Sequence, residues 1–235
     1  MSLSRPVLVL DAYVDPAGGA GNLLRWLDGR PSAVVRTALG QVPSAPSDYA
    51  AALITGSAAS FADGVPWGGP LLAFLRAAAA DGLPVLGVCF GHQAIGEAFA
   101  GPGAVRKAPL PEVGFKEVVV DVPGDPVLGA LGARFTSFLS HEDEVAPAPR
   151  GLEVLAHSAA CPVQAVKVPG APIWGVQWHA EMGRDEQLHL LAYRAAKHPQ
   201  LALDVDAEAA RATQATDVAP VLFGAFLDVV AATGR

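Results

Sequence analysis

Residues 84–96, Pro-Val-Leu-Gly-Val-Cys-Phe-Gly-His-Gln-Ala-Ile-Gly, constrain the fold more than any other stretch of the chain. The apolar run 85–88 predicts a short buried strand, and the residues after Cys89 predict a helix. A strand that reverses directly into a helix crowds the backbone, and Gly87 and Gly91 would relieve that crowding because they lack a Cβ. Such a turn lifts the cysteine clear of the sheet edge and places it at a helix N-terminus, which favours the thiolate.

A second stretch, residues 172–181, reads Pro-Ile-Trp-Gly-Val-Gln-Trp-His-Ala-Glu and predicts an apolar strand that ends in His179 and Glu181. Residues two apart on a strand point to the same face, so Glu181 would orient the His179 ring. His179 would then accept the proton of Cys89. We therefore predict a Cys-His-Glu catalytic triad, in preference to a buried core cysteine and an unrelated surface ion pair.

Two motifs carry a resemblance to a known family. Residues 87–93, Gly-Val-Cys-Phe-Gly-His-Gln, and residues 175–181, Gly-Val-Gln-Trp-His-Ala-Glu, resemble those of the class I glutamine amidotransferases. The chain is most similar to the glutaminase domain of GMP synthetases and its free-standing relatives, over roughly residues 5–195. It departs from the family pattern at Ala180, where the family usually has a proline; alanine frees φ and restores a backbone donor.

The alternation of apolar runs with helical patterns predicts an α/β fold. Strands are expected at 7–10, 33–36, 51–55 and 85–88, and helices at 22–27, 71–80 and 93–99. This order indicates βαβ units and a parallel sheet covered on both faces. After Gly101, strand-like runs follow one another without helices, at 116–120, 134–139, 152–157 and 163–168. We therefore expect a three-layer αβα, flavodoxin-like, mostly parallel sheet with a small antiparallel addition.

Residues 1–198 are expected to form the amidotransferase-like domain, and residues 199–235 a C-terminal helical extension. Leucines and alanines recur at helical spacing in 182–197, and Pro199 ends that pattern. The Ala-rich stretch 206–233 is also expected to be helical. It lies beyond the glutaminase core of the resembling family, so it would either pack back on the domain or form a contact between subunits.

The resemblance also implies an oxyanion hole. In the family, a glycine-containing loop after the third strand donates one N–H group, which points to Gly56 or Ser57 in this chain, and the other donor would be the N–H of Phe90. Glycine allows the close approach that such a donor needs. The alternative is an ordinary strand-to-helix loop, which is equally rich in glycine and serine.

Three further residues are candidates for substrate binding. Gln93 lies four residues after Cys89 and shares a helix face with it, and the family has a substrate-contacting glutamine there. Segment 140–145 resembles a Ser-His-x-Asp-x-Val segment of the GMP-synthetase branch, which implies that Ser140 and His141 bound the substrate, mostly through backbone groups. The alternative for this segment is a solvated acidic loop. Two other residues, His92 and Cys161, are expected to have no catalytic role.

Charge and composition exclude several classes of partner. The net charge is −7 and Lys and Arg do not cluster, which argues against nucleic-acid binding. No apolar stretch approaches the ~20 residues of a membrane helix, and the short apolar run at the N-terminus does not resemble a signal peptide. We expect a reducing, cytoplasmic setting. The sequence shows no Gly-x-x-x-x-Gly-Lys loop and no histidine cluster, so no cofactor and no metal site are predicted.

The expected activity is hydrolysis of the side-chain amide of glutamine through a cysteinyl thioester. A separate synthetase subunit would use the ammonia, or the chain would act alone as a γ-glutamyl hydrolase on peptides or amines. The sequence leaves open whether the chain forms a homo-oligomer. Two other classes remain: a PfpI-type protease, against which the late His-x-Glu pair argues, and a non-catalytic regulatory subunit, against which the intact Cys, His and Glu set argues.

Overall fold

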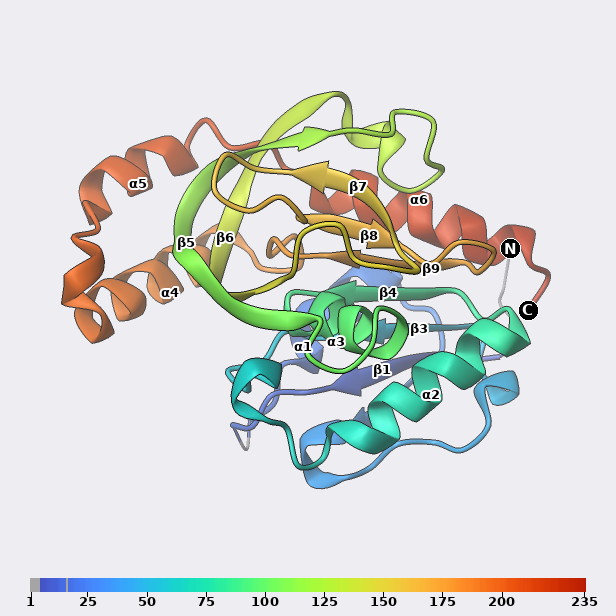
Figure 1. Cartoon of the computed structure of the whole chain (residues 1–235). Helices are drawn as coiled ribbons and strands as arrows, with labels where there is room; N and C mark the ends of the chain where they lie inside the picture. The colour runs from blue at the N-terminus through green and yellow to red at the C-terminus, as the bar shows by residue number, and fades with distance from the viewer. Residues whose placement is uncertain (1–4, 16) are drawn as a thin grey trace.

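The computed structural model describes residues 5–15 and 17–235. Within them the strands form one nine-stranded sheet in the order β2-β1-β3-β4-β9-β8-β7-β5-β6 (Figure 1). The strands are β1 Val7–Asp11, β2 Ser32–Arg36, β3 Ala51–Ile54, β4 Val85–Val88, β5 Val105–Val120, β6 Arg134–Val145, β7 Glu153–His157, β8 Ala165–Lys167 and β9 Ile173–Val176. The helices are α1 Ala20–Leu24, α2 Gly68–Asp81, α3 Phe90–Phe99, α4 Arg184–Lys197, α5 Val205–Ala212 and α6 Ala219–Ala232.

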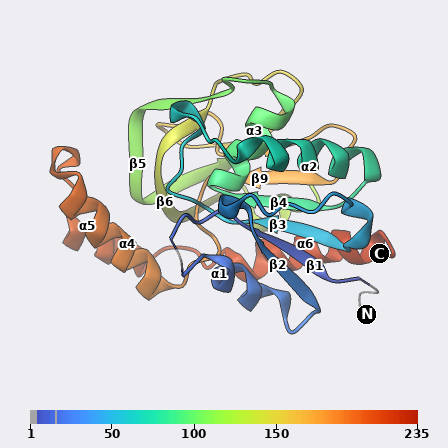
Figure 2. The same ribbon diagram turned by 90° about the horizontal axis from the view of Figure 1, so that it is seen from below.

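The first half of the sheet is parallel and confirms the predicted α/β fold. Strands β2, β1, β3, β4 and β9 pair in parallel. Because side chains alternate along a strand, Val7 and Val9 of β1 enter one core cluster while Leu8 and Leu10 enter another. Figure 2 shows α2 and α3 on one face of the sheet and α1 and α6 on the opposite face. The parallel half is therefore buried on both sides.

The antiparallel half is larger than the sequence indicated. It continues the same sheet through four antiparallel pairings. Its two long strands, β5 and β6, contain 16 and 12 residues. They curve strongly around the end of the sheet where α4 and α5 lie (Figure 1). The sequence predicted only 116–120 and 134–139 of them, because polar and charged residues interrupt the apolar pattern in the remaining parts.

The last helix completes the main core. In α6, Phe223 stacks on Trp26 at a ring separation of 5.6 Å, and Phe226 meets Trp174 edge-on at 6.5 Å. The helix therefore packs back on the parallel half of the sheet. None of the described helices combines the length and the apolar character that crossing a membrane requires.

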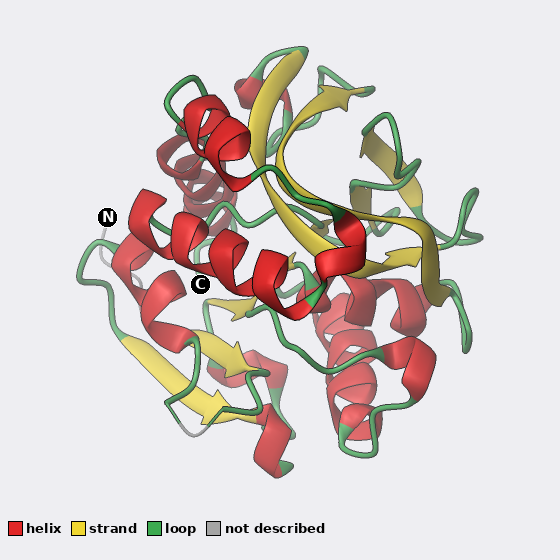
Figure 3. Cartoon of the chain, turned by 90° about the vertical axis from the view of Figure 1, so that its left-hand side faces the viewer, coloured by secondary structure: helices red, strands yellow, loops and turns green. Residues whose placement is uncertain are grey.

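Helices α4 and α5 lie at the end of the molecule where β5 and β6 curve. Figure 3 views the molecule from this end and shows helices in front of the curved strands. The α5 residue Glu208 accepts hydrogen bonds from the Phe115 N–H at 2.7 Å and from Lys116 Nζ at 2.9 Å. This buried carboxylate attaches α5 to β5.

Candidate active site

Cys89 occupies the turn between β4 and α3. Its backbone has φ 51° and ψ −100°, which is unusual for a residue with a side chain. The Cys89 N–H donates to the Val176 carbonyl at 2.8 Å, and the Cys89 carbonyl accepts from the Gln93 N–H at 3.0 Å. The residue therefore ends the β4–β9 pairing and begins the helix within a single position, as the sequence predicted.

The two glycines beside Cys89 are needed for close packing, not for unusual φ angles. A Cβ on Gly87 would lie 2.5 Å from the Gly91 carbonyl carbon, and a Cβ on Gly91 would lie 2.8 Å from the Ile54 carbonyl oxygen. Both distances are shorter than a carbon side chain allows, and the obstructing atoms are backbone. The sharp turn thus requires glycine at both positions.

His179 and Glu181 lie beyond the strand that was expected to carry them. Strand β9 ends at Val176, so alternation along a strand does not explain their pairing. The backbone is instead held by two contacts from elsewhere: the His179 N–H donates to the Phe138 carbonyl at 2.8 Å, and Trp26 Nε1 donates to the Glu181 carbonyl at 3.1 Å. The side chains still meet, because His179 Nδ1 lies 2.8 Å from Glu181 Oε1.

The charges around His179 stabilise its imidazolium form. Burial alone would lower the pKa of His179, but the charges of Glu181 and Cys89, together with hydrogen bonds to both, raise that pKa well above its usual value. Both members of the His179–Glu181 pair are buried, with side chains 5% and 2% exposed. The arrangement therefore favours a positively charged His179 ring.

A pocket of about 290 Å³ collects most of the residues predicted for the site. Cys89 and His179 face it from the parallel half of the sheet, and residues of β6 and α4 close the opposite side. Six of the nine predicted site residues line it: Cys89, His179, Ser57, Gln93, Ser140 and His141. Glu181 does not line the pocket; it contacts the ring of His179, which does.

The expected oxyanion-hole residues lie at the same place. A Cβ on Gly56 would come within 3.1 Å of His179 Cε1 and 3.7 Å of Cys89 Cβ, so this loop runs beside the pair. Ser57 accepts a hydrogen bond from the Ala59 N–H at 3.0 Å, which fixes its side chain within the loop. Phe90 is the first residue of α3, where N–H groups have no acceptor inside the helix.

The segment that carries Ser140 and His141 is not a solvated loop. It belongs to β6, and Ser140, His141, Asp143 and Glu144 are all buried. Arg194 of α4 donates to Ser140 Oγ at 3.0 Å. Their place in a strand that lines the pocket corrects the alternative that the acidic composition of this segment had left open.

Sequence reasoning missed several residues of the pocket. Tyr13 follows β1; burial, followed by the negative charges of Glu181 and Cys89, raises its pKa above the usual range. Lys107 of β5 bridges Asp63 at 2.6 Å and Asp143 at 3.0 Å. Neither residue belongs to a motif, and long-range folding alone brings them to Cys89. His92 is fully buried, and burial lowers its pKa to about 4.

A buried polar cluster lies behind the pocket. Ligand-type atoms of Glu112, His141 and Cys161 lie within 4.8 Å of one another, a grouping the sequence did not predict. The Glu112 carboxylate already accepts hydrogen bonds from Ser158 Oγ at 2.7 Å and Gln164 Nε2 at 2.6 Å. These bonds satisfy the oxygens of the Glu112 carboxylate, so the cluster is a hydrogen-bonded anchor. A cation that bound there would have to displace these bonds.

We expect iodoacetamide to distinguish the two cysteines. Cys89 lines the pocket, whereas Cys161 is 1% exposed and burial raises its pKa to about 12. The thiolate is the reactive form, so near neutral pH the folded protein should take one label, at Cys89. Peptide mass spectrometry locates the label. Cys161→Ala should be labelled like the wild type, and a label that appears first at Cys161 would contradict the assignment.

Comparisons with known proteins show the family of the chain. The model of the family "Glutamine amidotransferase class-I" matches residues 33–195. A GMP synthase (glutamine-hydrolyzing) subunit of Methanosarcina barkeri is 43% identical over 106 residues, which is 45% of this chain and 54% of that protein. The corresponding protein of Methanocaldococcus jannaschii is 41% identical over 104 residues, 44% of this chain and 54% of that protein. The chain thus spans about half the length of these relatives.

A solved structure extends the likeness to the whole fold. A glutamine amidotransferase from Methylobacillus flagellatus superposes with a TM-score of 0.75 at 22% identity, covering 97% of this chain and 95% of that one. At this identity the likeness concerns the fold alone. The family match, in contrast, covers more than half of the 235 residues and includes Cys89, His179 and Glu181. The chain therefore belongs to the class I glutamine amidotransferases, a family of enzymes.

Proposed function

We propose that this chain hydrolyses the side-chain amide of glutamine to glutamate and ammonia through a cysteinyl thioester, on a flavodoxin-like framework. One observation carries the proposal: the Cys89 sulfur, on a strained turn, shares a pocket with the ring of His179, and that ring is bonded to Glu181. Nucleophile, base and orienting group in this arrangement are the parts that acyl transfer through cysteine requires.

In the first half of the reaction, the Cys89 thiolate attacks the carboxamide carbon of glutamine. The carbonyl oxygen becomes an oxyanion, and the N–H groups of Phe90 and of Gly56 or Ser57 donate to it. One such donor typically lowers the barrier by ~3 kcal/mol. The His179 imidazolium gives its proton to the departing nitrogen, so ammonia leaves and a glutamyl thioester remains.

In the second half, His179 is neutral and accepts a proton from water as the water attacks the thioester. The carbon–sulfur bond breaks, glutamate leaves, and Cys89 regains the thiolate form beside a protonated His179. Throughout, Glu181 keeps the His179 ring in one orientation through its contact with Nδ1, and so Nε2 remains directed away from Glu181.

The names of the relatives support a proposal for the use of the ammonia. Those reported above are named as one subunit of GMP synthase, a glutamine-hydrolysing enzyme. We therefore propose that this chain works with a separate synthetase subunit, to which it delivers ammonia. The rival is a free-standing hydrolase that acts on γ-glutamyl peptides or amines.

A substrate panel tests the proposal. The purified chain should release glutamate and ammonia from glutamine in equal amounts, with a higher kcat/KM than for any γ-glutamyl peptide or amine. Glutamine should also slow the labelling of Cys89 by iodoacetamide, because both compete for one pocket. A clear preference for γ-glutamyl peptides would favour the free-standing hydrolase, and failure of glutamine to protect Cys89 or to turn over would reject the proposal.

A further inference from the structure

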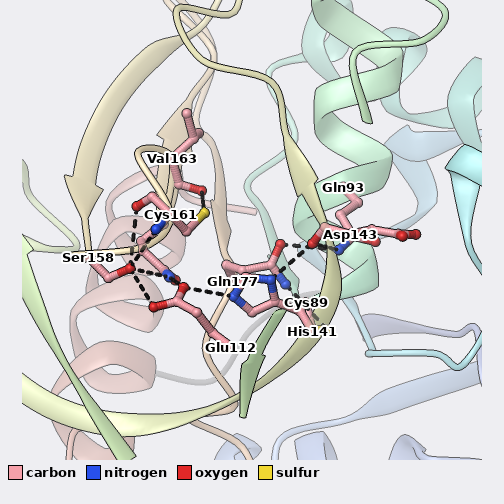
Figure 4. A network of polar contacts seen from close by, with 10 residues as sticks. Cys89, Gln93, Glu112, His141, Asp143, Ser158, Cys161, Val163 and Gln177 are labelled. Carbon is pink, nitrogen blue, oxygen red and sulfur yellow. Dashed lines mark hydrogen bonds and ion pairs between the residues drawn. The ribbon is translucent and has the colours of Figure 1, made fainter. Parts of the chain in front are cut away.

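A chain of buried amide side chains ends at the sulfur of Cys89 (Figure 4). Gln177, the residue directly after β9, is fully buried, and its Nε2 lies 3.5 Å from Cys89 Sγ. The Gln177 N–H also donates from the backbone to the Gln164 carbonyl at 2.8 Å, which fixes the position of the residue. Gln177 thus touches the sulfur from the side of the sheet core.

A backbone carbonyl determines which group donates and which accepts in this series of amide side chains. Gln93 Nε2 lies 3.1 Å from the Asp143 carbonyl oxygen and 3.1 Å from Gln177 Oε1. A carbonyl oxygen can only accept, so the amide nitrogen of Gln93 must face it, and its second hydrogen is left for Gln177. Gln177 must then present its oxygen to Gln93 and its N–H to Cys89.

Turning either amide around would produce repulsive contacts. A reversed Gln177 would place two amide nitrogens against each other at the Gln93 contact and would direct its oxygen at the sulfur. A reversed Gln93 would place its oxygen against the Asp143 carbonyl, and the Gln177 oxygen would lose its donor. In a buried site each such mismatch leaves polar groups unpaired and is destabilising, so the donor to Cys89 is fixed.

The Asp143 carbonyl is itself held in place from behind. It also accepts from His141 Nδ1 at 3.0 Å, and the other ring nitrogen of His141 meets Glu112 Oε2 at 3.1 Å. The hydrogen bonds of Glu112 to Ser158 and Gln164 complete the anchor. His141 and Glu112 therefore hold the Asp143 carbonyl in place, and this carbonyl determines the orientation of the two amides.

We propose that Gln177 stabilises the Cys89 thiolate by donating a fixed N–H to its sulfur, and that Gln93 and the Asp143 carbonyl set this orientation. The inference rests on the proposed function only in that the thiolate is the attacking species. A negatively charged sulfur accepts a hydrogen bond more strongly than a thiol does, so the donor shifts the equilibrium toward the thiolate. His179 and Tyr13, which also face Cys89, remain unchanged in the test below.

The test follows the rate of iodoacetamide labelling at Cys89 as pH is varied. Gln177→Met keeps the length of the buried side chain and removes the donor. Its labelling rate below the pH midpoint should fall about ten-fold, with the midpoint about one pH unit higher, the loss expected for a hydrogen bond to a charged group. Gln41→Met is the control, since Gln41 lies outside the pocket and outside this network, where its Oε1 accepts from the Arg36 N–H at 3.0 Å. Its profile should equal that of the wild type.

Two results would overturn the inference: an unchanged profile in Gln177→Met, or an equal shift in Gln41→Met. A second measurement uses the folded wild-type protein and does not depend on how a variant folds. The side-chain amide signals of Gln177 in NMR spectra should move with the same pH midpoint as the labelling, while those of Gln41 should not. If the Gln177 signals do not move as Cys89 titrates, the proposed hydrogen bond is refuted. Neither measurement involves glutamine, so turnover and thiolate stabilisation fail or succeed separately.

Discussion

Cys89→Ala is expected to lower glutamine hydrolysis by on the order of 10⁶-fold, the size of loss seen when a covalent nucleophile is removed. The reason is chemical, since no other thiol can form the thioester. Cys161 faces Val163 in a separate buried cluster and lies outside the pocket. Ammonia release under saturating glutamine measures the effect, with a coupled assay sensitive enough to detect the residual rate.

The matched control for this experiment is Cys161→Ala, the same substitution at the other buried cysteine. It should reduce stability, because it empties part of a packed cluster, but leave kcat near that of the wild type. Thermal melts of both variants separate loss of folding from loss of chemistry. A Cys89→Ala protein that folds and retains more than a small fraction of activity would eliminate the thioester mechanism.

Glu181→Gln is expected to lower kcat by roughly 10⁴-fold, as replacing the orienting carboxylate of a triad by its amide does. The amide can donate to His179 Nδ1 and so leave the proton on Nε2, the nitrogen that must accept from Cys89. The charge of Glu181 also contributes to the raised pKa of His179. Without that charge, the His179 pKa falls, and the imidazolium is lost at a lower pH than in the wild type.

The alkaline limb of the pH–kcat profile should therefore move to lower pH in Glu181→Gln. A purely structural role for Glu181 would lower activity without moving this limb. Glu117→Gln is a suitable control, since Glu117 forms an exposed pair with Arg134 at 2.8 Å, with side chains 57% and 64% exposed. That variant should match the wild type in rate and in profile. Equal activity of Glu181→Gln and the wild type would remove Glu181 from the triad.

The parts of the fold that the sequence predicts are those determined by short-range patterns. Strand β4 coincides with the predicted 85–88, and β1 differs from its prediction only by Asp11. Each is a continuous apolar run followed by a turn. The elbow at Cys89 was predictable for the same reason, since two glycines and a strand-to-helix change within a few residues allow few alternatives.

Long-range contacts explain what the sequence did not reveal. Buried polar residues of β5 and β6 bond to partners far along the chain; Glu112, for example, accepts a hydrogen bond from Gln164, 52 positions away. His179 and Glu181 pair beyond the end of β9 because Phe138 and Trp26 hold their backbone. The contact of Gln177 with Cys89 depends on how the amides of Gln177 and Gln93 are oriented, and the Asp143 carbonyl on β6 determines that orientation. No short-range pattern of apolar and polar residues in the sequence predicts such contacts.

The packing of α6 has a consequence for how the protein is made. One face of β1, β4 and β9 is covered by α6, whose residues are separated from β4 by more than a hundred positions. On the ribosome, the first four strands emerge long before this helix, at about 5–20 residues per second. Their apolar face therefore stays uncovered for several seconds, an interval in which exposed apolar surface favours contacts between newly made chains.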